Sequence, residues 1–133
     1  MLGEQIGEET GKVIVRRVIS ADGGTKVEVT TQATGKLLGI ETRSNITYCA
    51  DIRPDGSLYG EGQGLVIGKG GEQATWKGAG AGKLMEGGAV SYRGALYFYS
   101  VSPKLSHLNS VAVVYEYNAD AEGNTKSKFW DWK

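Results

Sequence analysis

The chain has 133 residues, which is enough for one domain with a hydrophobic core and too few for two ordinary domains. Its 15 basic and 15 acidic residues balance, so no net charge attracts nucleic acid or an anionic membrane surface, and we expect neither partner. A single cysteine, Cys49, and a single histidine, His107, exclude an intrachain disulfide and cysteine-rich or histidine-rich metal sites, so we expect no metal and no cofactor.

Residues 1–11 are polar and acidic, and they contain no apolar run. They are predicted to form a flexible lead-in to a domain that spans residues 12–133, rather than a signal peptide or a membrane anchor. No other stretch has the length of a membrane span, so a cytoplasmic protein is expected.

Residues 12–20, KVIVRRVIS, are rich in β-branched side chains and predict the first strand. A regular strand would point one of the adjacent residues Arg16 and Arg17 into the core, where it could bind an anionic head group. A β-bulge would instead let both side chains reach solvent, and this is the interpretation we adopt.

The second predicted strand, residues 26–38, has the clearest polar and apolar alternation in the chain, with one wet face and one core face. Gly35 is expected to mark a bend in it. A polar loop is predicted at residues 42–45, followed by a third strand at residues 46–53.

The stretch from Ser57 to Gly82 repeats glycine at every second position, twice. Because side chains alternate between the two faces of a strand, each set of glycines leaves one face of one strand bare. Glycine packs nothing and weakens a strand, so its repeated use indicates a strongly curved sheet with large side chains covering the gaps. The two sets are Gly60, Gly62 and Gly64, and Gly78, Gly80 and Gly82.

Two turns predict the register around these glycines. A three-residue loop at residues 54–56 places Tyr48 beside Gly62, with the glycines on the apolar face. A three-residue loop at residues 68–70 would place Trp76 beside Gly62 inside and Lys77 beside Glu61 outside.

The remaining strands are predicted at residues 89–101, 111–118 and 125–133, with a loop and one helical turn at residues 102–110. Eight strands joined by short turns form an antiparallel meander, whose exposed edges are removed if the sheet closes. The fold class is therefore all-β, a single eight-stranded antiparallel up-and-down β-barrel.

Six aromatic side chains fall on the proposed inner face, where they are expected to line an apolar pocket whose polar groups are phenol hydroxyls. The alternative is that these rings simply fill the barrel over the glycines. The candidate ligand-binding residues are Tyr48, Trp76, Tyr92, Phe98, Tyr115 and Tyr117.

Glu61 is the one candidate for an acid or base, although the predicted register makes it a solvated partner of Lys77. A pairing of Cys49 with His107 is not favoured, because a lone strand cysteine is most often a small hydrophobic residue. The glycine runs lack the Lys-Ser/Thr ending of a phosphate loop and precede no helix, so nucleotide binding is rejected. Trp130 and Trp132 indicate an apolar surface near the chain end, so we expect a homo-oligomer.

Three segments, YGEGQG, ATWKGAGAG and AVSYRGALYF, resemble the small bacterial barrels of the allene oxide cyclase-like (calycin-like) group, which includes uncharacterised domain families. The resemblance covers roughly residues 48–118. It implies an eight-stranded barrel, often oligomeric, with a hydrophobic cavity, and it carries over no catalytic residue.

Three functions follow from these features. The first is binding of a small, largely apolar molecule in the aromatic lumen. The second is an isomerase or cyclase that acts on a flexible apolar substrate there, using Glu61 or a tyrosine. The third is an oligomeric structural barrel with a filled core. An inward carboxylate would favour chemistry, whereas a lumen without one would favour binding.

Overall fold

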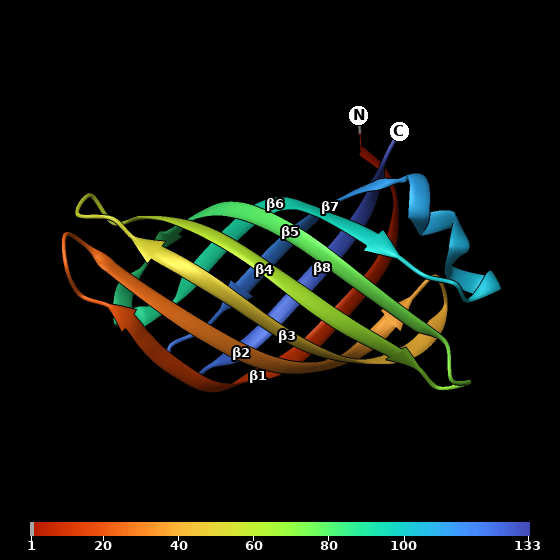
Figure 1. Cartoon of the computed structure of the whole chain (residues 1–133), viewed down its shortest axis with the longest axis horizontal. Helices are drawn as coiled ribbons and strands as arrows, with labels where there is room; N and C mark the ends of the chain where they lie inside the picture. The colour runs from red at the N-terminus through yellow and green to blue at the C-terminus, as the bar shows by residue number, and fades with distance from the viewer. Residues whose placement is uncertain (1) are drawn as a thin grey trace.

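The computed structural model describes residues 2–133 as a closed barrel of eight antiparallel strands in sequence order, with the last strand pairing back to the first (Figure 1). This confirms the predicted fold class. A 3-10 turn, η1 (Glu86–Gly88), and a 3-10 helix, η2 (Pro103–Ser110), lie between strands. The strands are β1 (Leu2–Ser20), β2 (Thr25–Leu37), β3 (Ile40–Ile52), β4 (Ser57–Gly68), β5 (Gln73–Leu84), β6 (Val90–Tyr99), β7 (Ala112–Ala119) and β8 (Asn124–Trp132).

The first strand begins ten residues before its predicted start at Lys12, so the prediction of a flexible lead-in was wrong for residues 2–11. These residues pair with β8 on one side and, from Gly7 onward, with β2 on the other. Their polarity hid the strand, because the inward positions carry Gly7, Glu9 and Gly11 instead of an apolar series. Residue 1 lies outside the described residues.

The polar loop predicted at residues 42–45 was also wrong, because these residues belong to β3. The turn lies earlier, at Leu38 and Gly39, and Leu37 pairs directly with Ile40. Both turn residues have positive φ, 50° and 80°, as a two-residue hairpin of the I′ type requires. Leucine is an unusual residue at such a position, where asparagine or aspartate before glycine is the common pattern. The Leu-Gly pair therefore gave no sequence signal for this turn.

The register between β3 and β4 is the predicted one, with Tyr48 opposite Gly62. Between β4 and β5 it differs by two positions, since Gly64, not Gly62, faces Trp76. The hairpin loop has the expected three residues but lies at residues 69–71, where Gly71 has a φ of 90°. A shift of two keeps every side chain on its predicted face, so Trp76 still covers a glycine.

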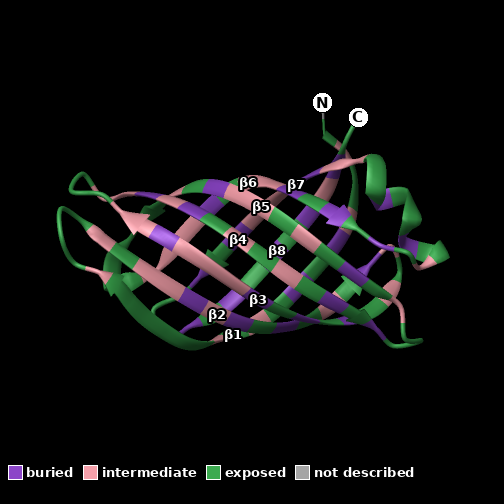
Figure 2. Ribbon diagram, in the orientation of Figure 1, coloured by how far each residue is buried: buried purple, intermediate pink, exposed green. Residues whose placement is uncertain are grey.

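The inward glycines of β4 and β5 lie under large side chains, as the repeated glycines predict. A Cβ atom at Gly64 would collide with the Trp76 ring, and one at Gly80 would collide with the Tyr115 hydroxyl. Buried and exposed segments alternate along the strands (Figure 2), which is the period of two expected of a sheet with one face on a core.

The bulge predicted in the first strand exists, but it does not turn both arginines outward. The register shifts at Ile14, after which Arg16 lies opposite Val29 and Arg17 opposite Glu28. Val29 is buried on the inner face, so Arg16 shares that face, whereas Arg17 points outward and forms an ion pair with Glu28 at 3.1 Å.

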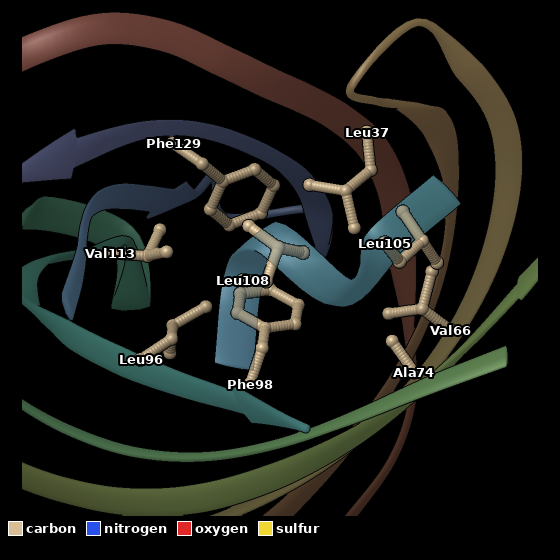
Figure 3. Close-up of a cluster of buried hydrophobic side chains, with 9 residues drawn as sticks. All are labelled: Leu37, Val66, Ala74, Leu96, Phe98, Leu105, Leu108, Val113 and Phe129. Carbon is tan, nitrogen blue, oxygen red and sulfur yellow. The ribbon is translucent and has the colours of Figure 1, made fainter. Parts of the chain in front are cut away.

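The two ends of the barrel interior hold separate hydrophobic clusters. At the end that we name the capped end, Leu105 and Leu108 of η2 insert completely buried among side chains of the strands (Figure 3). Their partners are Leu37, Val66, Ala74, Leu96, Phe98, Val113 and Phe129. At the opposite end, the tyrosine end, Tyr92 and Tyr117 pack with Tyr48, the buried Leu58 and two alanines, Ala50 and Ala119. Within residues 2–133, no helix has the length and apolar character needed to span a membrane.

Candidate ligand-binding site in the barrel lumen

A cavity of about 60 Å³ lies in the lumen, with side chains of both hydrophobic clusters in its wall. Five of the six candidate ligand-binding residues line it: Tyr48, Trp76, Tyr92, Tyr115 and Tyr117. The sixth, Phe98, does not line it and packs instead with the η2 leucines at the capped end. The strands bring these aromatic side chains together because their inward positions alternate with exposed ones.

Three tyrosines form a layer across the tyrosine end. Tyr48 packs edge-on against both Tyr92 and Tyr117, with ring centroids 5.8 and 5.7 Å apart, and the third pair is 6.1 Å apart. The hydroxyls of Tyr48 and Tyr117 are 3.3 Å apart, so one can donate to the other. The layer therefore presents phenol oxygens in an otherwise apolar cluster.

Burial keeps these phenols protonated. Desolvation is the largest cause in each case: it raises the pKa of Tyr48, Tyr92 and Tyr117 above the ordinary value and that of Tyr115 to about 12. At neutral pH all four are neutral hydroxyls. They can donate hydrogen bonds to a ligand oxygen, and they are poor general bases.

Glu9 is a functional candidate that sequence reasoning missed. This side chain of β1 points inward, is only 7% exposed and lines the cavity. The Ser44 hydroxyl donates a hydrogen bond to Glu9 Oε2. Burial raises the pKa of the Glu9 carboxyl above its usual value, and the Ser44 hydrogen bond only partly opposes this rise. The lumen therefore contains a carboxyl group that holds its proton more strongly than a solvated glutamic acid does.

The wall around Glu9 is polar, in contrast to the aromatic wall of β4–β7. Ser127 of β8 lies opposite Glu9 and also lines the cavity. Thr31 and Thr42 lie on the inner face of β2 and β3, and their buried hydroxyls have no hydrogen-bond partner among the described residues. The lumen thus combines one apolar wall with one wall of hydroxyls and a carboxyl.

Glu61 borders the cavity through its backbone alone, because its exposed side chain projects from the outer face of β4 and accepts a hydrogen bond of 2.6 Å from the Tyr59 hydroxyl. The predicted pairing with Lys77 was wrong, since the register sets Glu61 opposite Ala79. Cys49 and His107 are not brought together. Cys49 lies opposite Glu61 on the outer face of β3, whereas His107 is on η2, with its Nε2 3.9 Å from Oδ2 of Asp131.

Similar architectures occur in solved structures. A protein with unknown function from Clostridium acetobutylicum is 16% identical with a TM-score of 0.84, and the match covers 98% of each chain. A beta-barrel like protein from Acinetobacter baumannii is 13% identical with a TM-score of 0.82, covering 100% of this chain and 96% of the other. An enzyme from Penicillium herquei is 11% identical with a TM-score of 0.69, covering 96% and 92%.

No family model matches the sequence, and no curated protein matches it significantly. At these low identities the structural matches show the fold alone. They support a small barrel similar to proteins of unknown function, and none of them tests the resemblance to the allene oxide cyclase-like group.

Proposed function

We propose that the barrel lumen binds a small, largely apolar molecule. The cavity is the observation that carries this proposal, since a lumen whose side chains merely filled it would leave no such space. Its volume of about 60 Å³ limits the part of the ligand held there to a few non-hydrogen atoms, because benzene occupies engineered cavities of about 150 Å³. The neutral phenols supply donors for one ligand oxygen.

Butan-1-ol is a suitable probe of this site, and its binding can be followed by an NMR titration of the full chain. Ser127→Leu fills the cavity from the polar wall and should abolish binding. Lys126→Leu adds the same side chain at the neighbouring exposed position and should leave binding unchanged. Because overpacking costs about 1–3 kcal/mol, a circular dichroism melt confirms that each variant is folded.

Native mass spectrometry of protein purified from its host provides an independent measurement of a retained molecule. A titration in which butan-1-ol shifts no lumen resonance, together with a spectrum in which no small molecule is retained, would leave the structural barrel with a filled core as the better explanation.

Acid–base catalysis is a second candidate function, which one observation favours: the inward carboxyl of Glu9. A carboxyl group in an apolar cavity can move a proton to or from a bound substrate, while a phenol donates a hydrogen bond to the oxygen that gains negative charge. We propose an isomerase or cyclase on this basis, with Glu9 in the role that the sequence offered to Glu61. The resemblance to the allene oxide cyclase-like group supports such chemistry.

Exchange of the α-protons of butan-2-one in deuterated buffer, followed by NMR, tests whether the site moves protons. The wild-type protein should accelerate exchange, Glu9→Gln should abolish the acceleration, and Glu61→Gln on the outer face should retain it. Equal rates with the wild type and with Glu9→Gln would exclude Glu9 as the base in this reaction.

We also propose that copies of the chain associate near the two chain ends. Leu2 and Trp132 are paired across β1 and β8, and they are 56% and 58% exposed. Native mass spectrometry should show an oligomer of the wild type, and Trp132→Ser should shift it toward the monomer. A wild-type spectrum containing only the monomer at micromolar concentration would exclude this association.

A further inference from the structure

Arg16 is a charged residue on the inner face at the tyrosine end. Its Cα pairs with that of Val29, which pairs in turn with Tyr48, and paired residues of an antiparallel sheet project from the same face. The side chain of Arg16 therefore rises from the same face as the Tyr48 ring. Arg17, the next residue, projects from the outer face.

The strand that carries Arg16 extends beyond its neighbour on one side. The last pair between β1 and β8 joins Lys12 to Asn124, while β1 continues to Ser20 with β2 alone as its ladder partner. In Figure 1 the hairpin of β1 and β2 projects at the left beyond the end of β8, and Figure 2 shows the end of β1 as a continuous exposed stretch. Arg16 thus stands at the rim of the barrel opening.

The guanidinium of Arg16 has no carboxylate partner among residues 2–133. The neighbouring charges are used elsewhere: Arg17 pairs with Glu28, and Lys26 pairs with Asp51. On the inner face around Arg16 the register places apolar side chains, Val18, Val27 and Val29. The nearby polar groups are the phenols of Tyr48 and Tyr117. Burial raises the pKa of both phenols, and the positive charge of Arg16 partly opposes this rise.

We propose that the lumen ligand is an amphipathic carboxylate, whose head group binds Arg16 and the hydroxyls of Tyr48 and Tyr117 while its short apolar body occupies the cavity. This inference rests on the proposed binding function and specifies its ligand. The planar fork of a guanidinium matches a carboxylate and can bind it through two parallel hydrogen bonds. One arginine matches the single charge of a carboxylate, and the burial that raises the pKa of Glu9 disfavours a second negative charge deeper in the lumen.

The test compares butanoate with butan-1-ol, two probes of equal chain length that differ in head group. Both are titrated by NMR into the full-length wild type, Arg16→Gln and Arg17→Gln. Butanoate should bind the wild type more tightly than the alcohol, and Arg16→Gln should weaken butanoate roughly tenfold, as loss of a charge-assisted hydrogen bond does. Arg17→Gln changes the adjacent outward arginine and should leave binding unchanged. Raising the salt concentration should weaken butanoate and not the alcohol.

Other outcomes would overturn the inference in distinguishable ways. If butan-1-ol binds at least as tightly as butanoate, or if Arg16→Gln and Arg17→Gln behave alike, the carboxylate assignment fails and binding in the lumen stands. If neither probe binds the wild type, binding in the lumen fails and the assignment fails with it. Arg16→Lys keeps the charge but not the planar fork, so it should recover part of the lost affinity.

Discussion

The capped end and the tyrosine end of the barrel are filled by different kinds of side chain. At the capped end, η2 inserts Leu105 and Leu108 completely into a cluster of aliphatic and phenylalanine side chains. At the tyrosine end the three-residue turn η1 buries no side chain, and the cluster combines rings that carry hydroxyls with aliphatic side chains such as Leu58. The first end is a closely packed hydrocarbon plug, whereas the second combines apolar surface with hydrogen-bonding groups and a nearby cation.

From this difference we infer that one end of the barrel mainly stabilises the fold and the other mainly binds the ligand. A close-packed plug stabilises the fold, because every side chain in it is removed from water. The tyrosine end is where a ligand can be recognised, since its hydroxyls, the exposed Arg16 and the adjoining cavity lie together there. If this is correct, substitutions at the capped end should mainly change stability, and those at the tyrosine end should mainly change binding.

The largest expected effect is at the capped end. Leu108→Ala removes a completely buried side chain and leaves a cavity, so the free energy of unfolding should fall by about 3 kcal/mol in urea denaturation. Leu65→Ala is the matched control, because Leu65 is 38% exposed on the outer face of β4 and should cost under about 1 kcal/mol. Equal losses in the two variants would mean that η2 lies loosely on the barrel and forms no plug.

The glycines beneath the aromatic wall predict a smaller effect. A Cβ atom at Gly80 would meet the Tyr115 hydroxyl, so Gly80→Ala should displace that ring toward the cavity and cost about 1–3 kcal/mol. At Gly60 the nearest atom to a Cβ, Tyr92 Cε1, is 3.2 Å away, so Gly60→Ala should be tolerated better. Thermal melts of both variants measure the difference in stability, and a larger loss with Gly60→Ala than with Gly80→Ala would contradict this packing.

The aromatic wall could be predicted from the sequence because its signal is local. Glycines at a period of two and inward tyrosines on neighbouring strands define one face of the sheet, and an error of two positions between β4 and β5 left that face unchanged. The precise register was out of reach because Gly68, Gly70 and Gly71 could each take a turn position, and only the three-dimensional structure shows which one has positive φ.

The polar wall could not be predicted in the same way. On the first half of β1 the inward residues are Gly7, Glu9 and Gly11, so no hydrophobic alternation marks residues 2–11 as part of a strand. Glu9 was assigned to a lead-in for this reason, and only closure of the barrel brings it opposite Ser127 and within reach of Ser44. A carboxyl in a polar segment appears exposed until its distant neighbours along the chain are known.

At the tyrosine end, removing one hydroxyl should have a modest effect on stability. Tyr117→Phe leaves the Tyr48 hydroxyl without its partner at 3.3 Å and should cost about 1 kcal/mol in urea denaturation. Tyr97→Phe, which removes a hydroxyl from a residue that is 61% exposed, should cost nothing measurable. If Tyr117→Phe is as stable as the wild type but binds butanoate more weakly, the hydroxyl serves recognition alone, which would sharpen the contrast between the two ends.

The smallest expected effect is a dependence of the free energy of unfolding on pH. It tests the carboxyl of Glu9, which lies between the two ends. The pKa of Glu9 is raised in the folded state, so protonated Glu9 stabilises the fold. This contribution is complete when the pH is below the ordinary pKa of a glutamic acid, and it is lost as the pH rises through the folded pKa. The amide introduced by Glu9→Gln cannot ionise, whereas the other carboxyls titrate alike in both proteins. The free energy of unfolding of Glu9→Gln minus that of the wild type should therefore increase as the pH rises above the ordinary pKa of a glutamic acid, and it should level off above the folded pKa of Glu9. A difference that stays flat, or that decreases with pH, would show that Glu9 is hydrated or ion-paired, and acid–base chemistry in a dry lumen would lose its main support.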